Sequence, residues 1–142
     1  MNHQEPLTHL MHKSIWLMDR FADALLTKHF QLSFSRFYVL AVLGTIEPTT
    51  QHGLASCLGY SDAAVSRMVG ALQEEGLLSQ IDDPQHGRKH VVALTKEGRE
   101  ILAKCNDLLE REFDALLGRA ALDKEEVRHA MQGIRDQLEQ SL

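Results

Sequence analysis

The hydrophobic period of the chain changes from helical to strand-like near its middle and then returns to helical, and this order limits the folds that the chain can adopt. Helical spacing of apolar residues over 51–58 and again over 61–76 is interrupted by a tight turn at Gly59. Residues 77–81 and 89–94 then read as two short strands, with a proline and a glycine between them. Helix, turn, helix and hairpin in this order predict a helix-turn-helix that carries a β-hairpin wing.

Side chains that can cap a helix stand just before the helical segments. Four of them are placed to accept hydrogen bonds from the first free backbone N–H groups of the helix that follows: Ser33, Thr50, Ser61 and Thr95. Gly53 lies inside the short helix after Thr50, where glycine costs up to about 1 kcal/mol relative to alanine. We therefore expect tertiary packing to hold that helix in place.

Further helical patterns flank this central segment. Apolar residues three and four apart run over 7–25, and a second pattern fits 34–43, with Gly44 just past its end. A long helix follows over 96–116, and a last one begins after Asp123. We predict a mainly α fold with a small β-hairpin wing, built as a single domain of 142 residues.

The composition is that of an ordinary globular protein, with 44% hydrophobic and 25% charged residues. The longest apolar run, residues 37–44, is too short for a membrane span, and the N-terminus lacks the pattern of a secretion signal. Two cysteines, Cys57 and Cys105, do not make a disulfide framework. We expect a cytoplasmic protein without a cofactor.

The acidic excess lies in the last third of the chain. The chain carries 15 Lys and Arg against 20 Asp and Glu, and residues 100–142 alone hold six against ten. Net charge by itself disfavours nucleic acid as a partner, because phosphate contact needs local cations. The hairpin nevertheless carries a small cluster of basic residues, Arg88 and Lys89, and Lys96 and Arg99 follow shortly after it in the sequence.

In a helix-turn-helix the start of the second helix enters the major groove of DNA, and the wing reaches the neighbouring backbone or minor groove. Small residues at that start allow a close approach, while hydroxyl groups and an arginine can contact phosphates or bases. The candidate DNA contacts are Thr50, Ser61, Ala63, Ala64, Ser66, Arg67, Arg88 and Lys89.

The same central region also carries a pattern that is typical of one family. The residues that form the pattern are 54–61, 65–69, 72–78, Asp83-Pro84, Arg88 and 94–98. This pattern resembles the winged-helix core of the MarR family, the multiple-antibiotic-resistance regulators. Residues 32–43 resemble the second helix of that family.

The resemblance implies a homodimer that binds double-stranded DNA at a pseudo-palindromic operator, most often as a repressor. It places the winged-helix lobe at residues 32–96 and the dimerisation helices at residues 5–30 and 97–142. Two positions depart from the family pattern. Gly53 stands where many members have an acidic residue, and His86 replaces the acid that helps to hold the wing arginine.

The resemblance also implies release of DNA by a small ligand or an oxidant. A ligand would act where the dimer helices meet the winged-helix lobe, and the candidate lining residues are His12, Trp16, Arg36, Phe37 and Tyr38. Aromatic and aliphatic side chains with one or two cations suit a small aromatic or carboxylated molecule.

Several other interpretations remain open at this point. The acidic last third favours a helical adaptor that binds protein, whereas Ser66, Arg67 and Arg88 favour DNA. Cys57 or Cys105 could sense an oxidant, although neither stands near the start of the first helix, where oxidant-sensing members carry their cysteine. The eight histidines show no metal-ligand spacing, and no enzyme motif is present.

Overall fold

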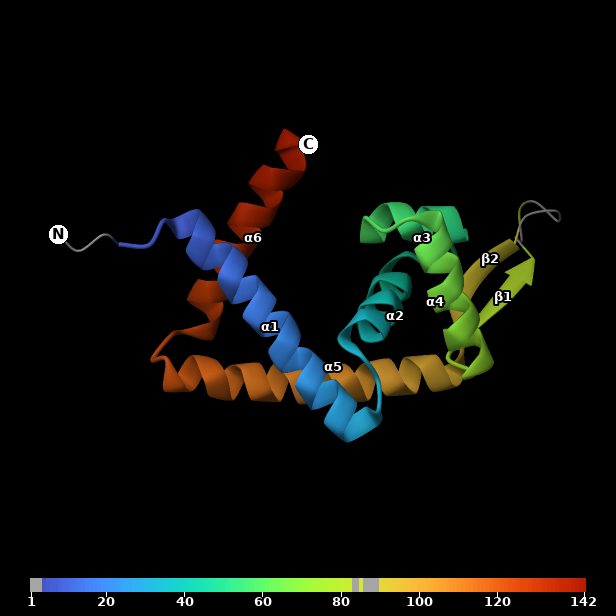
Figure 1. Cartoon of the computed structure of the whole chain (residues 1–142), viewed down its shortest axis with the longest axis horizontal. Coiled ribbons are helices and arrows are strands. Elements are labelled where there is room, and N and C mark those ends of the chain that lie inside the picture. Colours follow the sequence, from blue (N-terminus) through green and yellow to red (C-terminus); the bar gives the residue numbers. More distant parts are fainter. Residues whose placement is uncertain (1–3, 83–84, 86–89) are drawn as a thin grey trace. The chain divides into compact units, whose positions relative to one another are not determined.

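The structure, a computed structural model, describes residues 4–82, 85 and 90–142. Within these residues the chain forms six helices and one antiparallel strand pair (Figure 1). The fold is mainly α with a small hairpin, as the sequence predicts. The elements are α1 (Leu7–Phe30), α2 (Phe34–Ile46), α3 (Gln51–Leu58), α4 (Asp62–Glu74), β1 (Leu78–Asp82), β2 (His90–Leu94), α5 (Lys96–Arg119) and α6 (Lys124–Ser141).

The chain divides into two compact units, Met1–Cys105 and Asn106–Leu142, and α5 contributes residues to both. The hydrophobic core of the first unit lies mainly among three helices, α2, α3 and α4, and the hairpin, and Ala22 and Leu26 of α1 contribute to it. The core residues of the three helices are Phe37, Val39, Leu40 and Leu43 of α2, Leu54, Ala55 and Leu58 of α3, and Val65, Val69 and Leu72 of α4. Each helix therefore presents one apolar face inward.

The helix-turn-helix consists of α3 and α4, joined by a turn in which Gly59 has a φ angle of 69°. Thr50 Oγ1 accepts a hydrogen bond from the Gly53 amide at 3.0 Å. Ser61 Oγ accepts one from the Ala64 amide at 3.1 Å. Both predicted caps are confirmed, and they determine where the two helices begin.

The wing is an antiparallel pair in which Leu78 lies opposite Leu94. A third segment joins it, because the Thr49 amide donates to the Val92 carbonyl at 3.3 Å and the Val92 amide donates back at 2.7 Å. Thr49 also explains Gly53, since a Cβ there would lie 2.5 Å from Thr49 Oγ1. The predicted strands are confirmed, with β1 shifted by one residue toward the C-terminus.

The predicted end of α2 is wrong. The helix does not stop before Gly44 but continues to Ile46, and Glu47 is the residue after its last turn. Gly44 lies within the helix, where a Cβ would be 3.2 Å from the side chain of Leu102. Pro48 explains the actual end, because the residue before a proline is disfavoured in the helical conformation.

The carboxylate of Glu47 joins three elements of the first unit. Its side chain is only 13% exposed, and Oε2 accepts a hydrogen bond from the Leu94 amide at 2.6 Å. The other oxygen pairs with the guanidinium of Arg99. One side chain thus links the end of α2 to the end of β2 and the start of α5.

A second junction lies between β2 and α5. Thr95 Oγ1 accepts a hydrogen bond from the Gly98 amide at 3.0 Å, which confirms the predicted cap, and donates to the Gly76 carbonyl at 2.6 Å. The backbone is tightly packed here, because a Cβ at Gly98 would lie 1.9 Å from the Leu77 carbonyl oxygen. Thr95 therefore ties the turn after α4 to the start of α5.

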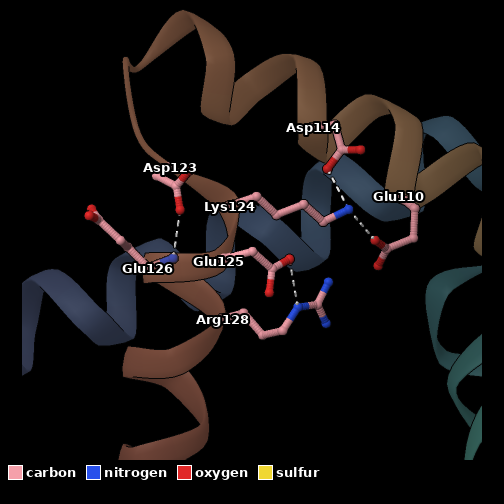
Figure 2. Close-up of polar contacts among 7 residues, drawn as sticks. All are labelled: Glu110, Asp114, Asp123, Lys124, Glu125, Glu126 and Arg128. Atoms are coloured by element: carbon pink, nitrogen blue, oxygen red, sulfur yellow. Dashed lines mark hydrogen bonds and ion pairs between the residues drawn. The ribbon is translucent and has the colours of Figure 1, made fainter.

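In the second unit, ion pairs connect α5 to α6 (Figure 2). Asp123 Oδ1 accepts a hydrogen bond from the Glu126 amide at 2.9 Å and caps α6. Lys124 Nζ lies 2.7 Å from Asp114 Oδ1 and 3.0 Å from Glu110 Oε2. Hydrogen bonds to Asp114 and then Glu110 raise the pKa of the Lys124 ammonium above its usual value.

Helices α1 and α6 each carry large apolar side chains that are exposed in the single chain. On α1 these are Leu7, Leu10, Ile15, Trp16, Leu17 and Met18, and on α6 they are Met131, Ile134 and Leu138. None of the helices in the described part of the chain combines the length and the apolar character that crossing a membrane requires.

We expect Glu47→Ala to lower the free energy of unfolding by about 1–3 kcal/mol, because it leaves the Leu94 amide without its acceptor. Arg99→Ala is the matched control, since it removes only the half-exposed partner and should cost at most about 1 kcal/mol. Urea unfolding followed by circular dichroism measures both. Equal costs for the two variants would mean that the hydrogen bond to Leu94 contributes little.

Candidate nucleic-acid interface

The face of α4 that points away from the core is polar and sterically open. Its buried face consists of Val65, Val69 and Leu72, so the residues between them turn outward. The exposed residues of the helix start are Ser61, Asp62, Ala63, Ser66 and Arg67, and Ala64 is half-buried. Two small side chains, two hydroxyls, one acid and one arginine therefore share a short stretch of surface.

The hydroxyl groups that cap α3 and α4 belong to Thr50 and Ser61. Each oxygen already accepts a backbone hydrogen bond within its own helix. A hydroxyl group also has one hydrogen to donate, so each cap can still bond to an anionic oxygen. Thr50 is half-buried and Ser61 is exposed, which gives Ser61 the easier access.

The arginines of the first unit differ in their availability. Arg36 pairs with Glu75, and Arg99 pairs with Glu47, so both hold helices together. Arg67 is exposed on the outward face of α4. Arg67 is therefore the arginine of the helix-turn-helix that is best placed to meet a partner.

A hydrogen-bonded pair that the sequence does not predict connects α3 and α4. His52 Nδ1 lies 3.1 Å from Asp62 Oδ1 and 3.3 Å from Asp62 Oδ2. The two side chains are 79% and 70% exposed. His52 is the second residue of α3 and Asp62 the first of α4, and only the turn between the helices brings them together.

The predicted wing contacts, Arg88 and Lys89, lie outside the described residues, as does His86. The described base of the wing ends at Asp82 and His90, where His90 Nδ1 lies 3.4 Å from Asp82 Oδ1. The strand register places these two residues opposite each other.

A cleft of about 440 Å³ opens between α1 and α2. It is lined by Trp16, Asp19, Arg20, Asp23, Ala24, Phe34 and Ser35. The Arg20 guanidinium lies 4.8 Å from the centre of the Trp16 ring, and Asp23 Oδ1 accepts a hydrogen bond from the Phe34 amide at 2.8 Å. The cleft therefore combines aromatic surface with both signs of charge.

Of the five residues that the sequence nominates for an effector site, Trp16 lines this cleft. Tyr38 lies beside it, because its ring stacks on Phe34 at 5.9 Å. His12 is exposed on α1, Phe37 is in the core, and Arg36 is held by Glu75. The cleft residues that sequence reasoning missed belong to the turns of α1 after Trp16 and to the start of α2.

The two cysteines have different environments. Cys57 is exposed on α3, and Cys105 is buried in α5. Burial raises the pKa of the Cys105 thiol to about 11, so this thiol is almost fully protonated at neutral pH. Among the described residues, no three potential metal ligands come together.

Comparison with known proteins now identifies the fold. A sequence model of the MarR family matches residues 30–89, which include α2, α3, α4 and β1. This part of the chain is therefore similar to the MarR family. No curated protein sequence matches it.

Solved structures match the chain over nearly its whole length. The transcriptional regulator BldR from Sulfolobus solfataricus is 25% identical with a TM-score of 0.79, and the match covers 94% of this chain and 93% of that chain. Wild-type MarR from E. coli in its apo form is 24% identical with a TM-score of 0.81, covering 96% and 99%. An E. coli MarR mutant in complex with operator DNA is 24% identical with a TM-score of 0.76, covering 94% of each chain.

These matches confirm the resemblance to the MarR family on which the sequence interpretation relied. They give the chain the winged-helix fold of the MarR structures, with α4 as the second helix of the helix-turn-helix. The structure accounts for one departure from the family pattern, since the space at Gly53 is filled by the side chain of Thr49. The other departure, His86, belongs to the segment that is not described.

Proposed function

We propose that this protein is a member of the MarR family and a sequence-specific DNA-binding transcriptional regulator, a homodimeric repressor of the cytoplasm that a small molecule releases from DNA. The observation that carries the DNA-binding role is the exposed start of α4, which presents Ser66 and Arg67 beside the small residue Ala63. The complex of an E. coli MarR mutant with operator DNA, a protein of the same fold, supports the same interpretation.

The chemistry of the α4 face suits a major groove. Ala63 and the half-buried Ala64 allow the helix backbone to approach base edges, and Ser66 can donate to or accept from them. Arg67 can bond to guanine or to a phosphate. Thr50 and Ser61 would donate their hydroxyl hydrogens to backbone phosphates, while Arg88 and Lys89 would contact DNA from the wing.

Apolar surface on α1 and α6 supports the proposed homodimer. Met131, Ile134 and Leu138 recur at helical spacing on α6 and are 47%, 36% and 58% exposed in the single chain. Such a stripe is unfavourable in water, and pairing with a second copy would bury it. We propose that residues 5–30 and 97–142 form this interface and that residues 32–96 form the DNA-binding lobe.

The α1–α2 cleft supports the proposed effector site. Trp16 and Phe34 offer faces on which an aromatic ring can stack, and Arg20 offers a cation for a carboxylate. Phe34 is the first residue of α2, the helix that packs against α3 and α4. A small aromatic acid bound here would act on DNA binding only if it favours one position of α2 over another.

We expect the affinity of the protein for random duplex DNA to fall at least about a hundredfold between 50 and 200 mM salt, because phosphate contacts release counterions. Arg67→Ala should weaken binding by about 1–3 kcal/mol, whereas Arg119→Ala, with the same charge change on α5, should not. Fluorescence anisotropy of labelled duplex measures both effects. Weak salt dependence and an unaffected Arg67→Ala variant would instead favour the protein-binding adaptor.

We expect Ile134→Glu to convert the dimer into a monomer, because it places a charge in the middle of the apolar stripe of α6. Gln132→Glu adds the same charge on α6 away from the stripe and serves as the control. Analytical ultracentrifugation gives the mass of each, and circular dichroism shows whether each remains folded. A folded Ile134→Glu protein that is still dimeric would place the interface elsewhere.

We expect millimolar salicylate to change the emission of Trp16, the only tryptophan, and to weaken operator binding by about 1–3 kcal/mol of coupling free energy. Salicylamide lacks the carboxylate and should act much more weakly, and Arg20→Gln should remove the difference between the two compounds. Equal effects of the acid and the amide would exclude a carboxylate site in this cleft.

A further inference from the structure

The His52–Asp62 pair has no role in the packing of the first unit. Both side chains are more than two-thirds exposed, and neither helix needs the pair in order to begin, because Thr50 and Ser61 already cap α3 and α4. Even a fully charged pair that is this exposed contributes little to stability. The pair nevertheless lies at the start of α4, the position from which a recognition helix meets base edges.

Asp62 retains unused capacity to accept hydrogen bonds. A carboxylate has about four acceptor positions, and the contact of one imidazole N–H with both oxygens uses at most two of them. His52 Nδ1 lies at nearly equal distances, 3.1 and 3.3 Å, from the two oxygens, so it faces the carboxylate squarely and restricts its rotation. The remaining lone pairs are directed to solvent in the free protein, as the 70% exposure of Asp62 shows.

A carboxylate at the start of a recognition helix is unfavourable for DNA binding unless a nucleobase donates a hydrogen bond to it. Phosphates repel a carboxylate, and in the major groove the bases present two amino donors, the N4 group of cytosine and the N6 group of adenine. In adenine the acceptor N7 lies beside the amino group. A carboxylate has no hydrogen to donate to N7, so it cannot pair with both groups. Cytosine presents only its donor there and is the usual partner of Asp and Glu.

We propose that Asp62 is a specificity-determining residue that accepts a hydrogen bond from cytosine N4, and that His52 is the positioning residue that orients its carboxylate. This inference rests on the proposed function, because it assumes that α4 enters the major groove. It assigns to each half-site one base pair at which cytosine is preferred. It also gives His52 a role through Asp62, without contact to the base.

The experiment selects bound sequences from a random duplex library with the full-length wild-type protein and its variants. The wild type should enrich a two-fold symmetric site with cytosine at one position of each half-site, about 5- to 100-fold over other bases. Asp62→Asn should shift that position toward adenine, because a carboxamide can bond to both N6 and N7. Asp62→Ala should abolish the preference there and leave the other positions unchanged.

Two further variants test the positioning role. His52→Ala should reduce the cytosine preference, while His52→Asn should restore much of it, since the asparagine amide can place a donor where Nδ1 lies. Glu97→Gln removes a carboxylate from the first turn of α5 and is the matched control for charge at a helix start. It should leave the selected sequence unchanged.

Each result decides between defined alternatives. Unchanged base preference in both Asp62 variants would overturn the inference, even if their thermal stability fell, because Asp62 would then only favour the start of the helix. Enrichment of no sequence by the wild type would overturn the proposed function itself. A shift confined to one position per half-site in Asp62→Asn would support the assignment.

Discussion

The carboxylate of Glu47 is the interaction on which the geometry of the first unit depends. It satisfies the Leu94 amide at the end of β2 and the Arg99 guanidinium at the start of α5, while its own backbone follows the last turn of α2. A carboxylate that is only 13% exposed is tolerated when hydrogen bonds and an opposite charge compensate for its lost hydration. Because Glu47 has both kinds of partner, it can join three elements at one point.

Thr95 continues this connection toward the helix-turn-helix. Its hydroxyl bonds to the Gly98 amide within α5 and to the Gly76 carbonyl just after α4. The close packing of Gly98 on Leu77 leaves little freedom between these segments. The orientation of α4 in the first unit is therefore set at both ends, by the turn at Gly59 and by the junction at Thr95. A helix that reads bases needs this kind of support, because small errors in angle misplace its side chains.

Sequence reasoning succeeded where the decisive contacts are local. The caps at Thr50, Ser61 and Thr95 bond to amides three residues away, so the sequence alone predicts them. It failed at the end of α2, where Pro48 and packing against Leu102 outweigh the helix-ending tendency of Gly44. The partners of Glu47 lie 47 or more residues away along the chain, and no periodicity signals such a contact.

In the candidate site, too, the sequence predicts the local features but not the contacts between distant segments. The spacing of residues on α4 predicts which side chains face outward, since one buried face fixes the other. The His52–Asp62 pair depends on how the turn at Gly59 brings two helix starts together, and the α1–α2 cleft depends on which turn of α1 faces Phe34. Of the five nominated effector residues only Trp16 lines the cleft, because helix packing decides this and amphipathicity does not.

The distribution of charge bears on how an acidic protein can act on DNA. Of the chain's 20 acidic residues, ten lie in residues 100–142. The net charge of −5 therefore arises mainly outside the segment that holds α3 and α4. That segment is not strongly basic either, since Arg67 is the only Lys or Arg in residues 51–74. Few cations per protomer mean that few counterions are released and that one lobe alone has a modest affinity for DNA.

Tight operator binding would then require two lobes on one dimer, because linkage raises the effective concentration of the second lobe without any new contact. The exposed apolar stripe of α6 and the sparse cations of the helix-turn-helix are thus two consequences of one proposed design, in which pairing supplies the affinity that charge does not.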